Sequence, residues 1–169
     1  MISKKEITLT NLDFHIILPK ITSKSFQVMK YADLNKNKLK YYNIILYNYP
    51  GNVGHWTLFC FDKGRMYFFD PYGNAPDSQW SFLQNPEQKS PPEFKLSQFI
   101  KECVEKNYSF NRNSYNIQGS IRNGHIVDSA CGEIIILRIL YNDLDDFEFY
   151  KMCLKLGGKK IFNLIKNLK

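Results

Sequence analysis

The sequence predicts an α+β fold in a single domain, residues 1–169. Three short apolar runs separated by turn residues are typical of strands, and several longer runs have the length or the periodicity of helices. The two kinds of element are mixed along the chain without regular strand–helix alternation, which favours α+β over a doubly wound sheet. With 169 residues, 44% of them hydrophobic, the chain can bury one substantial core.

The opening third is predicted to contain short helical segments. The first is "NLDFHIILPK" (11–20), which Pro19 is expected to end because proline lacks the N–H that a helix requires. The second is "KSFQVMKYADL" (24–34), which follows directly.

Three strands are predicted next. "YYNIILYNY" (41–49) is bounded by "PGNVG", and "HWTLFCF" (55–61) is separated by "DKG" from "RMYFFD" (65–70). "PYGNAP" then reads as a turn.

The second half is predicted to be mainly loop and helix. A proline-bearing loop (84–94) leads to the helix "LSQFIKECVEKN", and the asparagine-rich stretch 109–129 is expected to be loop with one short strand. "ACGEIIILRILYNDL" fits a buried helix or a strand by periodicity, and its length favours a helix. The acid-free segment 151–169 carries six lysines and predicts a basic amphipathic helix, which can pack on the body with its lysines in solvent.

Composition narrows the classes of protein. A net charge of +7 is compatible with binding to a polyanionic partner, and it can equally serve only to keep the protein in solution. No apolar run reaches membrane-spanning length and "MISKKEITLTNLDF" lacks the apolar core of a secretory signal, so we expect no membrane association and an intracellular protein. The four cysteines form no C-x-x-C pair, so neither a disulfide scaffold nor a metal site is expected; Cys60, Cys103 and Cys153 are predicted to be packing residues.

Strand pairing brings a histidine close to a carboxylate. If Lys63-Gly64 is a two-residue hairpin turn, Thr57 faces Asp70 and shares a sheet face with His55. His55 and Asp70 are then diagonal neighbours within hydrogen-bonding reach, whereas a register shifted by one residue would put them on opposite faces. A histidine oriented by a carboxylate is part of a catalytic triad.

A nucleophile is available in "DSACGE". Asp128 or Ser129 can cap the following helix, which places Cys131 in its first turn, where free N–H groups and the helix dipole favour a thiolate. Gly132 would let a substrate backbone approach closely. The alternative is a small residue chosen for helix packing.

These motifs together, "GHW", then "FFDPYG", then a glutamine followed by "DSACG", resemble the adenovirus-type cysteine proteases and their relatives in virophages and large DNA transposons. The resemblance extends more distantly to the SUMO-deconjugating peptidases, and it runs from about residue 20 to about residue 145. It implies a papain-like type of α+β fold, in which a mixed central sheet packs on the helix headed by the catalytic cysteine.

By that resemblance, Cys131 is the nucleophile, His55 the base and Asp70 its orienting acid, while Trp56 beside the histidine shapes the site. The family's oxyanion donor is a glutamine. Gln118 fills this role only if "SIRNGH" is an inserted loop, because it lies thirteen residues before Cys131, farther than the family's spacing. The alternative donor is Asn123.

The resemblance further implies a monomeric endopeptidase without cofactor or metal that cleaves after small residues, chiefly glycine, in capsid or core precursors during particle maturation. Such a protein acts in the virion and the host cell interior, with DNA as a partner for its lysine-rich surfaces. Two alternatives remain. One is an isopeptidase for a ubiquitin-like modifier, or an acyltransferase with the same triad; the other is a non-catalytic, basic DNA-binding module.

Overall fold

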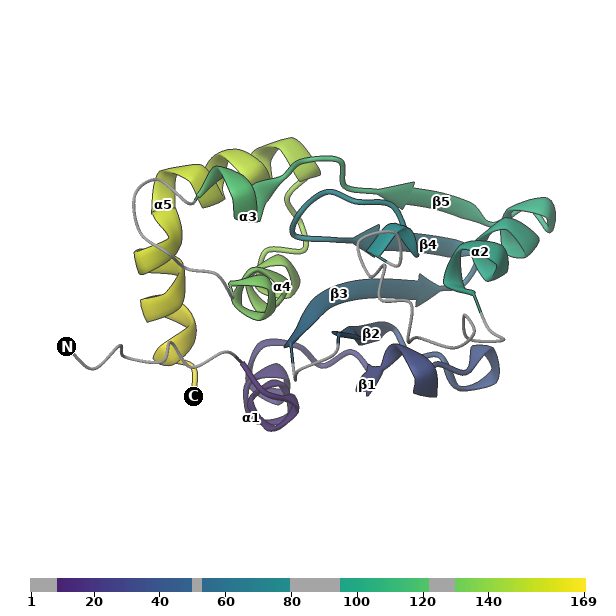
Figure 1. Ribbon diagram of the computed structural model, residues 1–169, viewed down its shortest axis with the longest axis horizontal. Coiled ribbons are helices and arrows are strands. Elements are labelled where there is room, and N and C mark those ends of the chain that lie inside the picture. Colours follow the sequence, from purple (N-terminus) through teal and green to yellow (C-terminus); the bar gives the residue numbers. More distant parts are fainter. Residues whose placement is uncertain (1–8, 50–52, 80–94, 122–129) are drawn as a thin grey trace.

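A computed structural model describes residues 9–49, 53–79, 95–121 and 130–169 of the chain (Figure 1). The described part is an α+β structure built on one five-stranded sheet with the strand order β1-β2-β3-β4-β5. The strands are β1 (Phe26–Lys30), β2 (Tyr42–Tyr49), β3 (Val53–Asp62), β4 (Arg65–Phe69) and β5 (Ser109–Arg112). The helices are α1 (Asn11–Ile21), α2 (Leu96–Glu105), α3 (Ile117–Ser120), α4 (Cys131–Leu140) and α5 (Asp146–Lys166).

The sheet is mixed. β2, β3 and β4 run antiparallel to one another, whereas β1 pairs parallel with β2 and β5 parallel with β4. The predicted hairpin turn is confirmed: Asp62 faces Arg65, and Lys63 and Gly64 have φ angles of 33° and 84°. Positive φ at both turn residues is what a two-residue hairpin of matching twist requires. The register of β3 against β4 is therefore the predicted one, and it extends to Leu58 facing Phe69.

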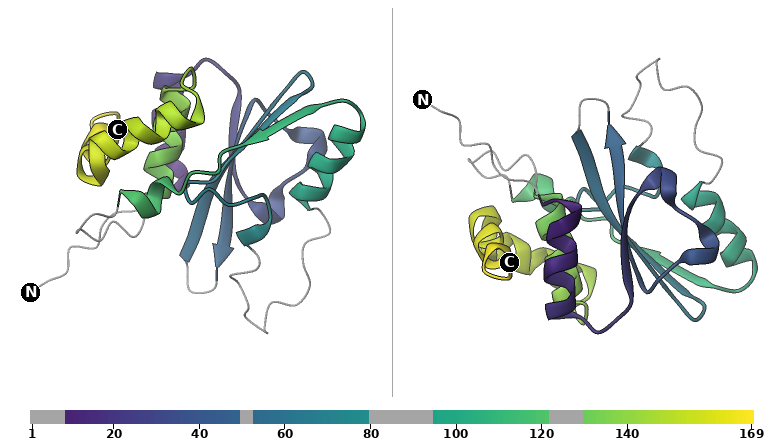
Figure 2. Two further views of the ribbon diagram at one scale, coloured as in Figure 1. Left: turned by 90° about the horizontal axis from the view of Figure 1, so that it is seen from above. Right: turned by 90° about the horizontal axis from the view of Figure 1, so that it is seen from below.

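Helices cover both faces of the sheet (Figure 2). Side chains of α1, α4 and α5 pack on the face that carries Ile44 and Leu58. Those of α2 pack on the opposite face, which carries Ile45 and Phe59. Burial on both sides explains why the strands are almost continuously apolar. It also explains α4, which is apolar all round because it lies between the sheet and α5.

Two predictions for the opening third were wrong. α1 continues through Pro19 to Ile21. Proline in the last turn costs only one backbone hydrogen bond, and the bond from the Thr22 N–H to the Leu18 carbonyl closes the helix beyond it. The segment 24–34 is not helical, because residues 26–30 form strand β1 and Tyr31–Asp33 a 3-10 turn. Pairing with β2 supplies hydrogen bonds along the whole strand, and tertiary context of this kind overrides a weak helical preference.

The later elements agree more closely with prediction. The helices at 96–105 and 131–140 and the short strand at 109–112 are confirmed, while α3 within the asparagine-rich stretch was missed. The C-terminal helix forms as α5 with a kink at Gly157, whose φ is 69°. Its Ile161 and Ile165 are buried in the core, so the basic tail packs on the body. The predicted proline-bearing loop lies outside the described residues.

Candidate active site

The hairpin brings His55 and Asp70 together as the register predicts. His55 lies near the beginning of β3, and Asp70 follows the last residue of β4. The His55 Nε2 and the Asp70 Oδ1 are 2.8 Å apart, and both side chains are buried, with 5% and 0% of their surface exposed. The ring of Tyr72 lies against the imidazole with 5.2 Å between centroids. The predicted diagonal pair is thus confirmed as a hydrogen-bonded histidine–carboxylate pair.

A tight turn and an asparagine hold Asp70 in place. The Gly73 N–H donates to the Asp70 carbonyl at 2.7 Å, and the Tyr72 N–H donates to the Asp70 Oδ1 at 2.7 Å. Asn113 is fully buried: its Oδ1 accepts from the Asp70 N–H and its Nδ2 donates to the Asp70 carbonyl, both at 2.8 Å. These hydrogen bonds fix both the backbone and the carboxylate of Asp70, so the orientation of the acid does not depend on His55 alone.

Cys131 is the first residue of α4, as predicted. The N-cap is Ala130, which makes no side-chain capping bond; the prediction that Asp128 or Ser129 caps the helix was wrong, and both lie outside the described residues. The N–H groups of the first turn therefore receive no bond from the N-cap side chain, and they favour negative charge near Cys131. The thiol lies near enough to the His55 ring to raise the pKa of the imidazole. Since Nε2 faces Asp70, Nδ1 is the ring nitrogen that remains for the thiol.

His55 is more basic than an ordinary histidine. Burial lowers its pKa, but the hydrogen bond to Asp70, the nearby Cys131 thiol and the negative charge that both groups can carry outweigh burial and raise the pKa from 6.5 to about 9. An imidazolium and a thiolate side by side stabilise each other, and a thiolate is the nucleophilic form of cysteine. Chemically, the arrangement can activate a thiol and deliver a proton next to it.

Gln118 lies beside the acid-bearing turn. It sits in α3, it is only 2% exposed, and its N–H donates to the carbonyl of Pro71 at 2.9 Å. Its side-chain Oε1 has no hydrogen-bond partner within the described part of the chain. The alternative donor, Asn123, is outside the described residues, so the choice between the two amides stays open.

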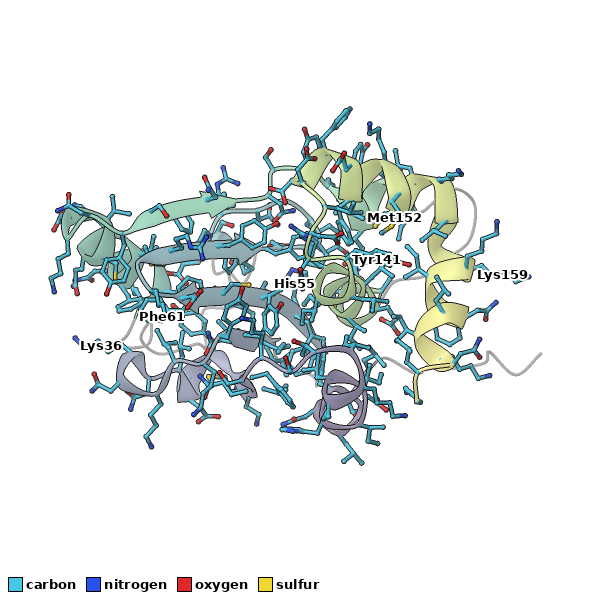
Figure 3. All side chains as sticks on the ribbon, turned by 180° about the vertical axis from the view of Figure 1, so that it is seen from behind. Lys36, His55, Phe61, Tyr141, Met152 and Lys159 are labelled. Carbon is cyan, nitrogen blue, oxygen red and sulfur yellow. The ribbon has the colours of Figure 1, made fainter. Side chains whose placement is uncertain are left out.

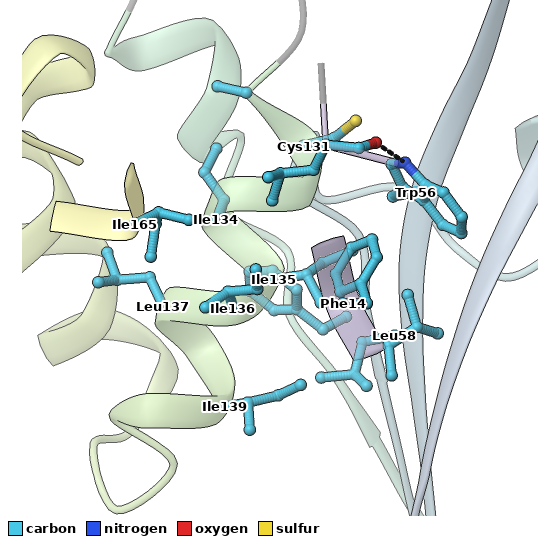
Figure 4. Packing of buried hydrophobic residues seen from close by; sticks show 14 of the residues in the cluster. Phe14, Trp56, Leu58, Cys131, Ile134, Ile135, Ile136, Leu137, Ile139 and Ile165 are labelled. Carbon is cyan, nitrogen blue, oxygen red and sulfur yellow. Dashed lines mark hydrogen bonds between the residues drawn. The ribbon is translucent and has the colours of Figure 1, made fainter. Parts of the chain in front are cut away.

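Trp56 and Gly132 are both packed against Leu9, which precedes α1. The Trp56 Nε1–H donates to the Leu9 carbonyl at 3.3 Å, and its ring packs edge-on against Phe14 (Figure 4). A Cβ added to Gly132 would lie 3.0 Å from the Cβ of Leu9. The measured neighbours of both residues are therefore Leu9 and the core, and their contribution to substrate binding stays a prediction.

The other three cysteines differ from Cys131 in their surroundings. Burial raises the pKa of the Cys60 and Cys153 thiols to about 12 and also raises that of Cys103. None of the four is in a disulfide. Among the described residues, Cys131 is the one cysteine with an imidazole near its thiol. Figure 3 labels His55, the histidine that supplies this imidazole.

Sequence reasoning missed Gln79 and Asn113, the two amides that contact Asp70. Asn113 comes from a stretch interpreted only as an asparagine-rich loop, and Gln79 from beyond the turn after β4. The positions of these two residues in the sequence do not indicate a contact with Asp70, because only the tertiary fold brings their loops close to it.

Comparison of the sequence with protein-family models and with curated proteins finds no match. Within the described ranges, no helix is both long enough and apolar enough to cross a membrane.

Proposed function

We propose that the protein is a cysteine peptidase with Cys131 as nucleophile, His55 as general base and acid, and Asp70 as the orienting carboxylate. One observation carries the proposal: a buried imidazole, bonded through Nε2 to a carboxylate at 2.8 Å, also lies near enough to a thiol at a helix N-terminus for that thiol to raise the pKa of the imidazole. The histidine and the acid come from the β3–β4 hairpin and the cysteine from α4, so local sequence does not explain why the thiol meets the other two groups.

The reaction follows the ordinary course of acyl transfer to a thiol. His55 takes the Cys131 proton, and the thiolate attacks the substrate carbonyl carbon. The Cys131 N–H and the Gln118 amide donate to the oxygen that becomes negatively charged. His55 then returns the proton to the leaving amine, and water, deprotonated by His55, hydrolyses the thioester. Asp70 holds the imidazole in the orientation that both proton transfers need.

The placement of the three groups supports a papain-like type of architecture. The helix headed by Cys131 packs on β3, and β3 and the residue after β4 supply the histidine and the acid. In this proposal α4 and the sheet are the two halves that carry the nucleophile and the base.

For the substrate we propose peptide bonds that follow small residues, chiefly glycine, in structural precursors of a maturing particle. We also propose that the protein acts as a monomer, in the virion and in the host cell interior. The resemblance to adenovirus-type proteases supports this assignment. Cys131 and His55 are only 4% and 5% exposed, which favours a substrate without bulk beside the scissile bond.

A peptide assay tests the activity. Two fluorogenic peptides that differ only in glycine or leucine before the scissile bond are incubated with the protein and with a Cys131→Ser variant. We expect cleavage of the glycine peptide alone, and none by the variant. Cleavage only of glycine-ended ubiquitin-like modifiers would favour the isopeptidase alternative. Equal turnover by the wild type and the variant would rule out Cys131 as the nucleophile.

We also propose DNA as a partner, bound without sequence preference through lysines of the first forty residues and of the tail. Eight and six lysines lie in these two segments. Each neutralised phosphate contributes close to one unit to the log–log slope of affinity against salt. Replacing Lys155, Lys159, Lys160 and Lys166 by glutamine should therefore weaken duplex binding and flatten the slope; unchanged binding would exclude the tail.

A further inference from the structure

The carboxylate of Asp70 has two oxygens with different partners. Oδ1 accepts from the His55 Nε2 at 2.8 Å and from the Tyr72 N–H at 2.7 Å. Oδ2 accepts from the Gln79 side-chain amide. Within the described part of the chain, Gln79 is the one side chain bonded to this second oxygen.

Asp70 is the one hydrogen-bond partner of the Gln79 side chain among the described residues. The residue is 1% exposed, and its Oε1 has no hydrogen-bond partner among the described residues. A carboxylate only accepts hydrogen bonds, so the amide must present its N–H groups to Asp70. Its own oxygen is left unsatisfied as a consequence, which is unfavourable for a buried group. Such a cost is typical of functional sites rather than of ordinary packing.

A second cluster fixes the backbone that carries Gln79. Two residues earlier, the Asp77 carboxylate accepts from the hydroxyl groups of Tyr31 at 2.6 Å and Tyr47 at 3.2 Å, and from the Ser97 N–H at 2.7 Å. Asp77 has a φ of 66°, a conformation that most side chains avoid. Strand β2 and helix α2 thereby hold the segment in a shape that delivers the Gln79 amide to Asp70.

We propose that Gln79 is a positioning residue for the reaction. Its amide holds the Oδ2 of Asp70, which prevents the carboxylate from rotating and keeps Oδ1 directed at the His55 Nε2, so that Nδ1 points to the Cys131 thiol. This inference rests on the proposed peptidase function for its catalytic consequence. The geometric part, in which Gln79 controls the bond between Asp70 and His55, stands independently of that function.

The test uses Gln79→Met, which keeps the length of the side chain and removes both donors, with Gln98→Met on the exposed surface of α2 as the matched control. The first readout needs no activity: exchange of the His55 Nε2 proton with water, followed by NMR with labelled histidine. We expect exchange at least tenfold faster in Gln79→Met and unchanged in Gln98→Met. Unchanged exchange in Gln79→Met would overturn the proposal.

Kinetics give the second readout. In the wild-type background Gln79→Met should lower kcat about tenfold with little change in KM, whereas in an Asp70→Asn background it should have no further effect, because Gln79 acts through Asp70. Equal losses in both backgrounds would show a merely structural role and overturn the proposal. If Gln79→Met fails to fold, Gln79→Leu, which also lacks both N–H donors and adds no charge, takes its place with the same expectations. Faster exchange in a protein that cleaves no peptide would disprove the peptidase function and leave the positioning role of Gln79 intact.

Discussion

The two ends of helix α4 each hold a buried polar network, and the two networks differ in how completely they are paired. At the C-terminal end, the Arg138 guanidinium donates to the Tyr67 hydroxyl at 3.3 Å and to the Tyr141 carbonyl at 2.8 Å, and it lies 3.7 Å from the Asp146 carboxylate. The Tyr67 hydroxyl in turn donates to Asp146. Every polar group named here has a partner.

At the N-terminal end, by contrast, the network contains a thiol and leaves amide oxygens open. Gln79 and Gln118 each have a buried Oε1 without a partner among the described residues. Cys131 begins the helix after Ala130, whose side chain makes no capping bond. A fully paired network stabilises a fold, whereas a buried polar group left unsatisfied costs stability and calls for another explanation, such as a role in function. The difference supports the proposal that the N-terminal end serves chemistry and the C-terminal end stability.

The largest expected effect separates the Cys131 thiol, at the start of α4, from the Cys153 thiol, which lies in α5. Cys131→Ala should reduce kcat/KM by at least about 10⁴-fold with little change in thermal unfolding, because the position supplies the nucleophile. Cys153→Ala, at a fully buried core position, should lower the melting temperature and leave kcat/KM of the folded protein unchanged. Steady-state kinetics and calorimetry check both. Full activity in Cys131→Ala would end the peptidase account.

Asp70→Asn should have the next largest effect, a fall in kcat of about 10²- to 10³-fold, since a weaker orienting group still leaves an imidazole beside the thiol. His55→Ala should be more severe, close to Cys131→Ala.

The pH dependence of kcat/KM tests whether Asp70 raises the pKa of His55. The raised pKa of His55, about 9, means that the imidazolium and the stability it brings are fully present below about pH 6.5 and are lost as pH rises through about 9. The alkaline limb of kcat/KM should therefore lie near pH 9. In Asp70→Asn it should move to lower pH, because the carboxylate raises the pKa; an unmoved limb would show that Asp70 does not act on His55.

Gln118→Ala should lower kcat about 100-fold if its amide donates to the oxyanion. The matched variant is Asn123→Ala. Pre-steady-state acylation rates distinguish the two donors: a change within twofold for Gln118→Ala together with a large loss for Asn123→Ala would assign the oxyanion donor to Asn123.

The smallest effect on catalysis is expected at the other end of the helix. Arg138→Met removes the partner of Asp146 and Tyr67 and should lower the free energy of unfolding by about 3 kcal/mol, measured by urea denaturation. The rate at which the folded protein alkylates at Cys131 should not change. A large loss of thiol reactivity would show that the two networks are coupled through α4.

The histidine–acid half of the site could be predicted from the sequence because one local feature fixes it. The two-residue turn at Lys63-Gly64 sets the register of the hairpin, and the register decides which residues meet. Cys131 was predicted in the first turn of its helix, although the N-cap is Ala130 and not the predicted Asp128 or Ser129.

The remaining parts of the site depend on contacts between distant segments. Gln79 reaches Asp70 through the Asp77 cluster, and Asn113 reaches it from the segment after β5. Strand β1 was mistaken for helix for the same reason, since only its partner β2 gives it hydrogen bonds. Local propensity and periodicity contain no information about such pairings.

The central claim is that His55 and Asp70 activate the Cys131 thiol, and the rate of alkylation by iodoacetamide as a function of pH tests it most directly. Mass spectrometry identifies the modified residue in the wild type and in His55→Ala. We expect Cys131 to react at pH 6 at least tenfold faster than free cysteine, to be the first thiol modified, and to lose this advantage in His55→Ala. Reaction of Cys131 no faster than free cysteine, or equally fast in His55→Ala, would contradict the account.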